Sequence, residues 1–187
     1  MLKKLLLMAG VCFSLSAMAQ KTVYRSYNYM GILEGESKTG YQVLTTHGLQ
    51  LGSYFVGLGG GFDTYREWSF PVFVSASKSL FGGKNDLFLN ANAGTAFMPK
   101  HTSTSWSGQI SSGFRPGLFG EMGLAYRLQL HTMKSGQGVL FGAYYSYKAY
   151  KEKVMQPIFC INPPCPNEYD YLNYYLHRWA FKVGFVL

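Results

Sequence analysis

The sequence predicts an all-β protein, an eight-stranded antiparallel up-and-down transmembrane β-barrel that follows a cleaved signal peptide. Apolar and polar side chains alternate with a period of two through most of the 187 residues, which is typical of strands with two unlike faces. Charged residues make up 14% of the chain, against about 25% in an average soluble protein. Aromatic residues reach 17%, and glycine occurs 22 times. This apolar composition excludes a disordered chain, and it favours strands whose apolar face meets something other than water.

The N-terminal residues 1–19 have the features of a signal peptide for export. Lys3 and Lys4 provide a positive start, an uncharged apolar run follows, and an Ala-Met-Ala cleavage signature ends at Ala19. The run is shorter than the roughly 20 apolar residues of a membrane-spanning helix; an uncleaved anchor is the alternative. We expect cleavage after Ala19, which leaves residues 20–187 as one barrel domain. Because two lysines are lost, the net charge falls from +8 to +6 (8 − 2 = 6).

Eight segments of the remaining chain have the pattern of strands. The alternation is clearest in the later segments, where Leu118, Met122 and Leu124 are interleaved with Phe119, Glu121 and Gly123. The earlier segments show the same alternation less cleanly. The expected strands are residues 23–35, 40–51, 54–62, 70–78, 87–94, 118–129, 139–148 and 175–187.

The connections between these strands differ in length. Residues 52–53, 81–86 and 131–138 form short links, whereas residues 98–114 and 149–172 form long polar links rich in Ser, Thr, Pro and Asn. In an up-and-down barrel both long links fall at the same end. Outer-membrane barrels show this asymmetry, with short periplasmic turns and longer external loops.

The size of the side chains indicates which face of the sheet points outward. The apolar face carries many rings, whereas the opposite face carries mostly Gly, Ala, Ser and Asn. Since the interior of an eight-stranded barrel is only wide enough for modest side chains, so many rings would overfill it. We therefore expect the following rings to point outward, toward lipid: Tyr54, Phe62, Tyr126, Phe141, Tyr145, Tyr147, Tyr175, Trp179, Phe181 and Phe185.

Four charged residues on the opposite face then point into the lumen. Buried charges need partners, so we expect Glu121 to pair with one of the three basic residues Arg127, Arg178 and Lys182. The alternative is that some of these charges lie at a wet end of the barrel. A lumen filled in this way is not expected to form a wide water channel.

Several stretches resemble a known group of proteins. The segments 46–50, 56–65 and 70–73, which read THGLQ, VGLGGGFDTY and FPVF, resemble small eight-stranded outer-membrane barrels of the OmpX or OmpA-transmembrane type. The likeness is closest to the outer-membrane beta-barrel proteins common in Bacteroidetes. The resemblance implies a barrel in the outer membrane and no defined activity. The segment 182–187 is similar to the signal read by the barrel-assembly machinery, although it ends in Leu187 rather than phenylalanine.

Three further motifs can be interpreted either structurally or functionally. The glycines of residues 57–61 do not have the G-x-G-x-x-G spacing of a phosphate loop; they favour a strand that makes room in the lumen. Cys160 and Cys165 lie in the longest link, and export favours a disulfide between them. The motif His101-Thr102-Ser103 faintly resembles the His-x-Ser pair of outer-membrane lipid A deacylases, but its surroundings do not match.

A basic cluster, Lys148, Lys151 and Lys153, occurs where the seventh strand is expected to leave the membrane. Lipopolysaccharide phosphates lie at that level, and clustered cations attract clustered phosphates. We therefore predict a lipopolysaccharide contact here; a solvated loop base is the alternative.

These observations predict a small outer-membrane barrel with a structural or interaction role through its external loops. We expect no enzymatic activity, no cofactor, no metal and no nucleic-acid partner. The expected partners are outer-membrane lipid and lipopolysaccharide, the barrel-assembly machinery during biogenesis, and an unidentified loop-binding partner. The alternatives are a lipid A-modifying enzyme on the same scaffold, a narrow channel, and a soluble lipocalin-like binder.

Overall fold

The computed structural model describes seven parts of the chain: residues 22–35, 38–83, 85–99, 101–105, 108–129, 136–156 and 168–187. The predicted signal peptide of residues 1–19 and the two cysteines of the predicted disulfide, Cys160 and Cys165, lie outside the described residues. Within the described parts, every strand pairs in an antiparallel manner and no helix occurs.

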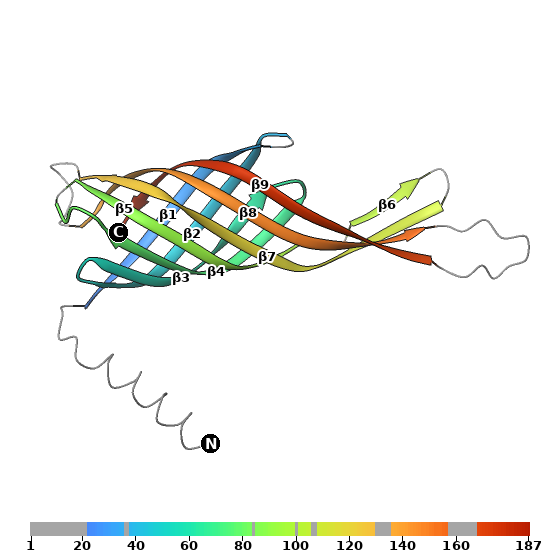
Figure 1. Cartoon of the computed structure of the whole chain (residues 1–187), viewed down its shortest axis with the longest axis horizontal. Helices are drawn as coiled ribbons and strands as arrows, with labels where there is room; N and C mark the ends of the chain where they lie inside the picture. Colours follow the sequence, from blue (N-terminus) through green and yellow to red (C-terminus); the bar gives the residue numbers. More distant parts are fainter. Residues whose placement is uncertain are drawn as a thin grey trace, which may run out of the picture.

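Eight strands close into a barrel, and a ninth short strand extends it (Figure 1). Strand β5 pairs directly with β7, and β1 pairs with β9 to close the sheet. Strand β6 pairs only with β7 in the described part of the chain. The strands are β1 (Thr22–Gly35), β2 (Gly40–Leu51), β3 (Tyr54–Thr64), β4 (Trp68–Ser79), β5 (Asp86–Phe97), β6 (His101–Ser105), β7 (Gly108–Leu128), β8 (Gly138–Gln156) and β9 (Glu168–Val186).

The eight-stranded antiparallel barrel predicted from the sequence is confirmed, but the two long links are not the loops that we expected. Much of the segment 98–114 is β6 and the first part of β7, while β8 runs on to Gln156 and β9 begins at Glu168. These outer strands lack an apolar face, so their Ser, Thr and Tyr residues gave no alternation to recognise. As predicted, both extensions lie at one end of the barrel, away from the C-terminus (Figure 1).

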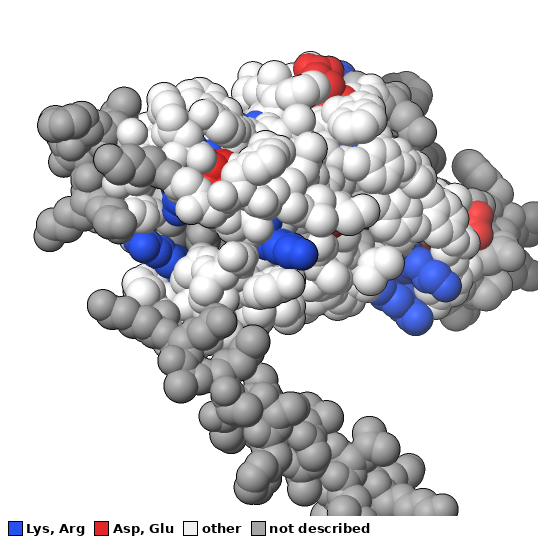
Figure 2. All heavy atoms as spheres, turned by 60° about the vertical axis from the view of Figure 1, so that its left-hand side comes forward, with Lys and Arg blue, Asp and Glu red and all other residues white. Residues whose placement is uncertain are grey.

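The outer surface of the barrel is apolar, as the size of the side chains predicted. Trp179 is 56% exposed and Tyr175 is 61% exposed. On the face shown in Figure 2, charged side chains are sparse and most of the surface is white. The other predicted rings that are strongly exposed are Tyr54, Tyr126, Phe141, Tyr145, Phe181 and Phe185.

The lumen contains more rings than we expected. Glycines make the room: a Cβ atom on Gly59 would collide with the ring of Phe73, and one on Gly142 with the ring of Tyr144. Each ring thus occupies the space of a side chain that a neighbouring glycine lacks, so small and large residues share the interior. The buried rings are Tyr27, Phe55, Tyr65, Phe73, Phe88, Phe119, Tyr144 and Tyr150.

Candidate functional site

One buried ion pair connects opposite walls of the lumen. The Lys148 ammonium on β8 donates hydrogen bonds to both carboxylate oxygens of Asp63 on β3, at 2.6 and 2.7 Å. It also donates to the hydroxyl oxygen of Ser69 at 2.6 Å. The rings of Tyr65 and Phe119 lie 4.5 and 5.9 Å from the same nitrogen. Since both charges are 0% exposed, the pair is a structural link across the interior.

This position of Lys148 corrects the prediction that it contacts lipopolysaccharide. Lys148 follows Tyr144 and Ser146 on the inward face of β8, and all three are buried. Lys151 is three residues farther along, and side chains an odd number of residues apart point to opposite faces of a strand. Lys151 is exposed, and Lys153 is partly exposed.

A second ion pair joins Lys182 on β9 to Glu121 on β7. The Asn92 amide donates to the same Glu121 oxygen at 3.1 Å, and the Tyr144 ring lies 4.5 Å from the lysine nitrogen. Both members are buried, as expected for two of the four predicted lumen charges. Of the basic residues considered, Lys182 is the partner of Glu121.

The other two predicted lumen charges, Arg178 and Arg127, have partners other than Glu121. Arg178 is buried and donates to the backbone carbonyl oxygens of Leu33, at 3.3 Å, and Lys38, at 2.6 Å. Its guanidinium carbon lies 5.0 Å from the centre of the Tyr65 ring. Arg178 therefore holds the end of β1 and the link that follows it.

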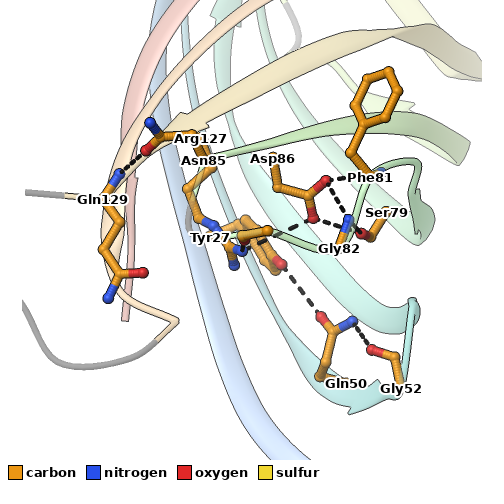
Figure 3. Close-up of polar contacts among 11 residues, drawn as sticks. Tyr27, Gln50, Gly52, Ser79, Phe81, Gly82, Asn85, Asp86, Arg127 and Gln129 are labelled. Atoms are coloured by element: carbon orange, nitrogen blue, oxygen red, sulfur yellow. Dashed lines mark hydrogen bonds and ion pairs between the residues drawn. The ribbon is translucent and has the colours of Figure 1, made fainter.

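Arg127 lies at the opposite end of the barrel, beside the turn between β4 and β5 (Figure 3). Its guanidinium is 3.8 Å from Asp86, which also accepts hydrogen bonds from the Ser79 hydroxyl and from the backbone N–H groups of Phe81 and Gly82. Gly82 has a φ of 66°, a left-handed conformation that glycine adopts at little cost. Asp86 therefore fixes this turn at the end of the barrel.

The two acidic partners, Asp63 and Asp86, were not among the predicted lumen charges. A signal was present for Asp63, because it continues the inward positions Phe55, Gly57 and Gly59 at intervals of two along β3. Its basic partner Lys148 is 85 residues away in the sequence, so no local sequence pattern could predict the pairing.

The lumen has almost no free space at the level of the Glu121–Lys182 pair. The cavity there measures about 10 Å³ and is lined in part by Tyr27, Phe55 and Tyr144. That volume accommodates about one water molecule. A wider hollow of about 440 Å³ lies at the turn end, beside Asp86 and Arg127. Rings and ion pairs thus fill the middle of the barrel.

The second candidate site is the projecting sheet, by which we mean the parts of β7, β8 and β9 beyond the barrel together with β6. The pairing between β8 and β9 continues to Gln156 and Glu168, whereas that between β1 and β9 stops at Gly35 and Arg178. Among the described residues, residues 168–177 of β9 therefore have no strand on their second side.

Tyrosine side chains dominate this part of β9. Tyr169, Tyr171 and Tyr175 are exposed. Tyr174 stacks on Tyr150 of β8 with 5.0 Å between the ring centres, and the Arg66 guanidinium lies 4.5 Å from the Tyr174 ring. Burial raises the pKa of Tyr150 to about 12. The projecting sheet thus has exposed tyrosines on its outward face and the stacked rings of Tyr150 and Tyr174 on the other face.

No metal site is evident among the described residues. They contain no group of three or more His, Cys, Asp and Glu side chains that could hold a metal ion, and they contain no helix long and apolar enough to cross a membrane. The side chains of His101 and Ser103 lie outside the described set.

Comparisons with protein-family models, with curated proteins and with solved structures find no match for this chain.

Proposed function

We propose that this protein is a small outer-membrane β-barrel without enzymatic activity, whose projecting sheet binds an extracellular partner. The observation that carries the proposal is the apolar band on the outer surface of the barrel. A large exposed apolar surface on a closed barrel is costly in water, but it is the surface that a lipid bilayer requires.

The height of the band fits a membrane. On β7, β8 and β9 the outward residues, apart from His177, are apolar, aromatic or small from the register level of Leu128, Val139 and Phe185 to that of Leu118, Ala149 and Tyr175. His177 shares a hydrogen bond with the Tyr145 hydroxyl. The two levels are ten residues apart, which is roughly 33 Å along a strand. At a strand tilt of about 40° this corresponds to about 25 Å along the barrel axis, the usual height of the apolar band in outer-membrane barrels.

The projecting sheet supplies the surface for a partner. A strand without a neighbour on one side offers backbone N–H and C=O groups to an added strand. Exposed tyrosines give large contact areas at a low cost in side-chain entropy. The free side of residues 168–177 and its tyrosines therefore favour an extended segment of another protein as the partner.

Location and orientation are tested together by labelling single cysteines on intact cells. In a Cys160→Ser, Cys165→Ser background, Asn173→Cys places a thiol on the projecting sheet and Ser53→Cys places one in the turn at the opposite end. We expect a membrane-impermeant maleimide to label the first variant and not the second. The wild-type protein should remain with outer-membrane fractions after carbonate washing and show heat-modifiable gel mobility.

Two results would contradict the proposal. Recovery of the wild-type protein in the soluble fraction would favour a lipocalin-like binder, and labelling of only the Ser53→Cys variant would invert the orientation. Lipopolysaccharide from a deletion strain should keep its acyl count; a changed mass would support the lipid A-modifying alternative. The nearly filled lumen argues against a wide channel.

A further inference from the structure

Three cations gather at one place on the outer face of the barrel. Arg115 on β7 and Lys151 on β8 face each other in the register of the two strands, and both are exposed. Lys153 is the next outward residue of β8 and is opposite Tyr171 on β9. We propose that Arg115, Lys151 and Lys153 form a binding site for the phosphate groups of an outer-leaflet glycolipid of the lipid A class.

A β-bulge brings Arg115 to this face. The pairing of β7 with β8 shifts between Arg115 and Leu118, so Pro116 and Gly117 together oppose a single residue, Tyr150. With strict alternation Arg115 would point to the face opposite that of Leu118. The extra residue shifts the alternation of inward and outward side chains by one position, as bulges do. This shift places the Arg115 guanidinium on the outward face, beside Lys151. The Pro116 nitrogen has no hydrogen to donate, which a bulge tolerates.

The bulge also leaves a hollow between the cations and the apolar band. This hollow measures about 330 Å³ and is lined by Arg115, Leu118, Lys151, Asn173 and Tyr175, among others. Two positive side chains lie on one side of it, and an aliphatic chain and a phenol ring lie on the other. This combination suits an amphiphile with an anionic head.

The charges of these cations are available for a ligand. Among the described residues, none of the three forms an ion pair. Two of them rest on rings: the Arg115 guanidinium lies 5.4 Å from the Tyr171 ring and the Lys153 nitrogen 3.6 Å from the Tyr169 ring. Such stacking orients a cation without neutralising it.

The acidic residues of the same segment lie on the other face. Glu152 is interleaved between Lys151 and Lys153, and Asp170 between Tyr169 and Tyr171, so alternation turns both away from the cations. Positive charge is thus concentrated on the outward face of the strands. An electrostatic field of one sign on one face attracts an anion more strongly than mixed charges do.

The level of the site indicates the kind of anion, and this step rests on the proposed function. The cations occupy the first register levels beyond the apolar band, which ends at Leu118, Ala149 and Tyr175. In a membrane, that level belongs to the lipid headgroups. A guanidinium can hold a phosphate through two parallel hydrogen bonds, and Lys151 adds a second charge, while the sugar and acyl parts cover the apolar side of the hollow.

The experiment measures lipid binding to the purified full-length protein in detergent, with heat-modifiable mobility as the check of folding. Diphosphoryl lipid A in mixed micelles is titrated against the wild type and the variant Arg115→Gln, Lys151→Gln, Lys153→Gln, and binding is quantified by native mass spectrometry. The matched control is Lys78→Gln, because Lys78 is an exposed cation that stacks on Tyr54 near the opposite end of the band. Parallel titrations use dephosphorylated lipid A and inorganic phosphate.

We expect a loss of about fivefold in lipid A affinity for each cation removed, the factor that corresponds to about 1 kcal/mol per cation near an anionic lipid surface. The control variant should bind like the wild type, and dephosphorylated lipid A and inorganic phosphate should bind far more weakly than diphosphoryl lipid A. Equal affinity of the wild type and the triple variant would overturn the site, and equal binding of inorganic phosphate would overturn the assignment to a lipid. Wild-type protein in the soluble fraction would refute the proposed function, whereas equal affinities for a protein in the outer membrane would refute this inference alone.

Discussion

At the scale of single residues, the lumen is organised by charges that have found partners. Lys148 donates to Asp63 and to Ser69, and Ser69 in turn donates to Asp63 at 2.6 Å. A buried pair of this kind adds little net stability, because desolvation offsets the attraction, but removing one partner is costly since the other charge is left unpaired.

The first prediction concerns this pair. We expect Lys148→Met to lower the free energy of unfolding by roughly 3–5 kcal/mol, because Asp63 would keep its charge in the interior with only Ser69 as a partner. The double variant Asp63→Asn, Lys148→Met should recover much of the loss. Urea titration of the folded, heat-modifiable form measures the midpoints.

Lys151→Met is the matched control for this experiment, since Lys151 is exposed on the same strand. It should change stability by no more than about 0.5 kcal/mol, as most surface substitutions do. Equal midpoints for Lys148→Met and Lys151→Met would contradict the expected cost of leaving Asp63 unpaired in the interior.

The position of Lys148 also shows why one prediction from the sequence was wrong. Lys148, Lys151 and Lys153 form a cluster in the sequence, but a strand separates Lys148 from the other two by turning it inward. Alternation alone could have made this distinction, since Tyr147 and Ala149 flank it on the outward face. The partner of Lys148 could not have been found in this way, because the register of the whole barrel brings Asp63 to it.

At the scale of elements, alternation predicted a strand wherever one face is apolar and the other is not. The expected strand 118–129 stops near the bulge of β7, because the bulge reverses the phase of the pattern and the residues beyond it have no apolar face. The two strands nevertheless stay paired beyond the bulge: residues 112–115 of β7 lie opposite residues 151–154 of β8. Backbone hydrogen bonds extend the element where side-chain pattern gives no sign of it.

The glycines of β2 and β3 lead to the second prediction. Gly48 and Gly57 are paired in the register of these strands, and a Cβ atom on Gly48 would collide with the Val56 carbonyl oxygen and with the Gly57 Cα atom. We expect Gly48→Ala to lower the free energy of unfolding by about 1–3 kcal/mol, the usual cost of overpacking. The urea midpoint of the folded form is the measurement.

Gly120→Ala on β7 is the matched control, because a Cβ atom at Gly120 meets nothing within 4 Å. This substitution should be neutral or should stabilise the strand by about 0.5–1 kcal/mol, since alanine loses less backbone entropy on folding. If both substitutions lower the midpoint equally, the close approach of β2 and β3 is not the reason for glycine at residue 48.

At the scale of the whole molecule, the outward position of the large rings was predictable from one physical limit, the width of an eight-stranded barrel. The same limit led us to expect an interior of small residues, which is only half correct. Rings such as Phe73 fit inside because Gly59 beside it leaves space. The sequence contains both residues, but only the register of β3 and β4 shows that they share one volume.

The filled interior leads to the last prediction, that the barrel does not conduct ions as a porin does. In the described part of the chain, three ion pairs follow one another along the lumen: Arg127–Asp86 near the turn end, Lys182–Glu121 in the middle and Lys148–Asp63 toward the projecting sheet. At the middle pair the free volume is about 10 Å³, room for about one water molecule, so a hydrated ion cannot pass without displacing buried rings. Refolded full-length protein in planar bilayers should therefore show no steady conductance when a porin in the same bilayer does. A steady conductance close to that of the porin would mean that these pairs open, and that the filled interior is one of two states.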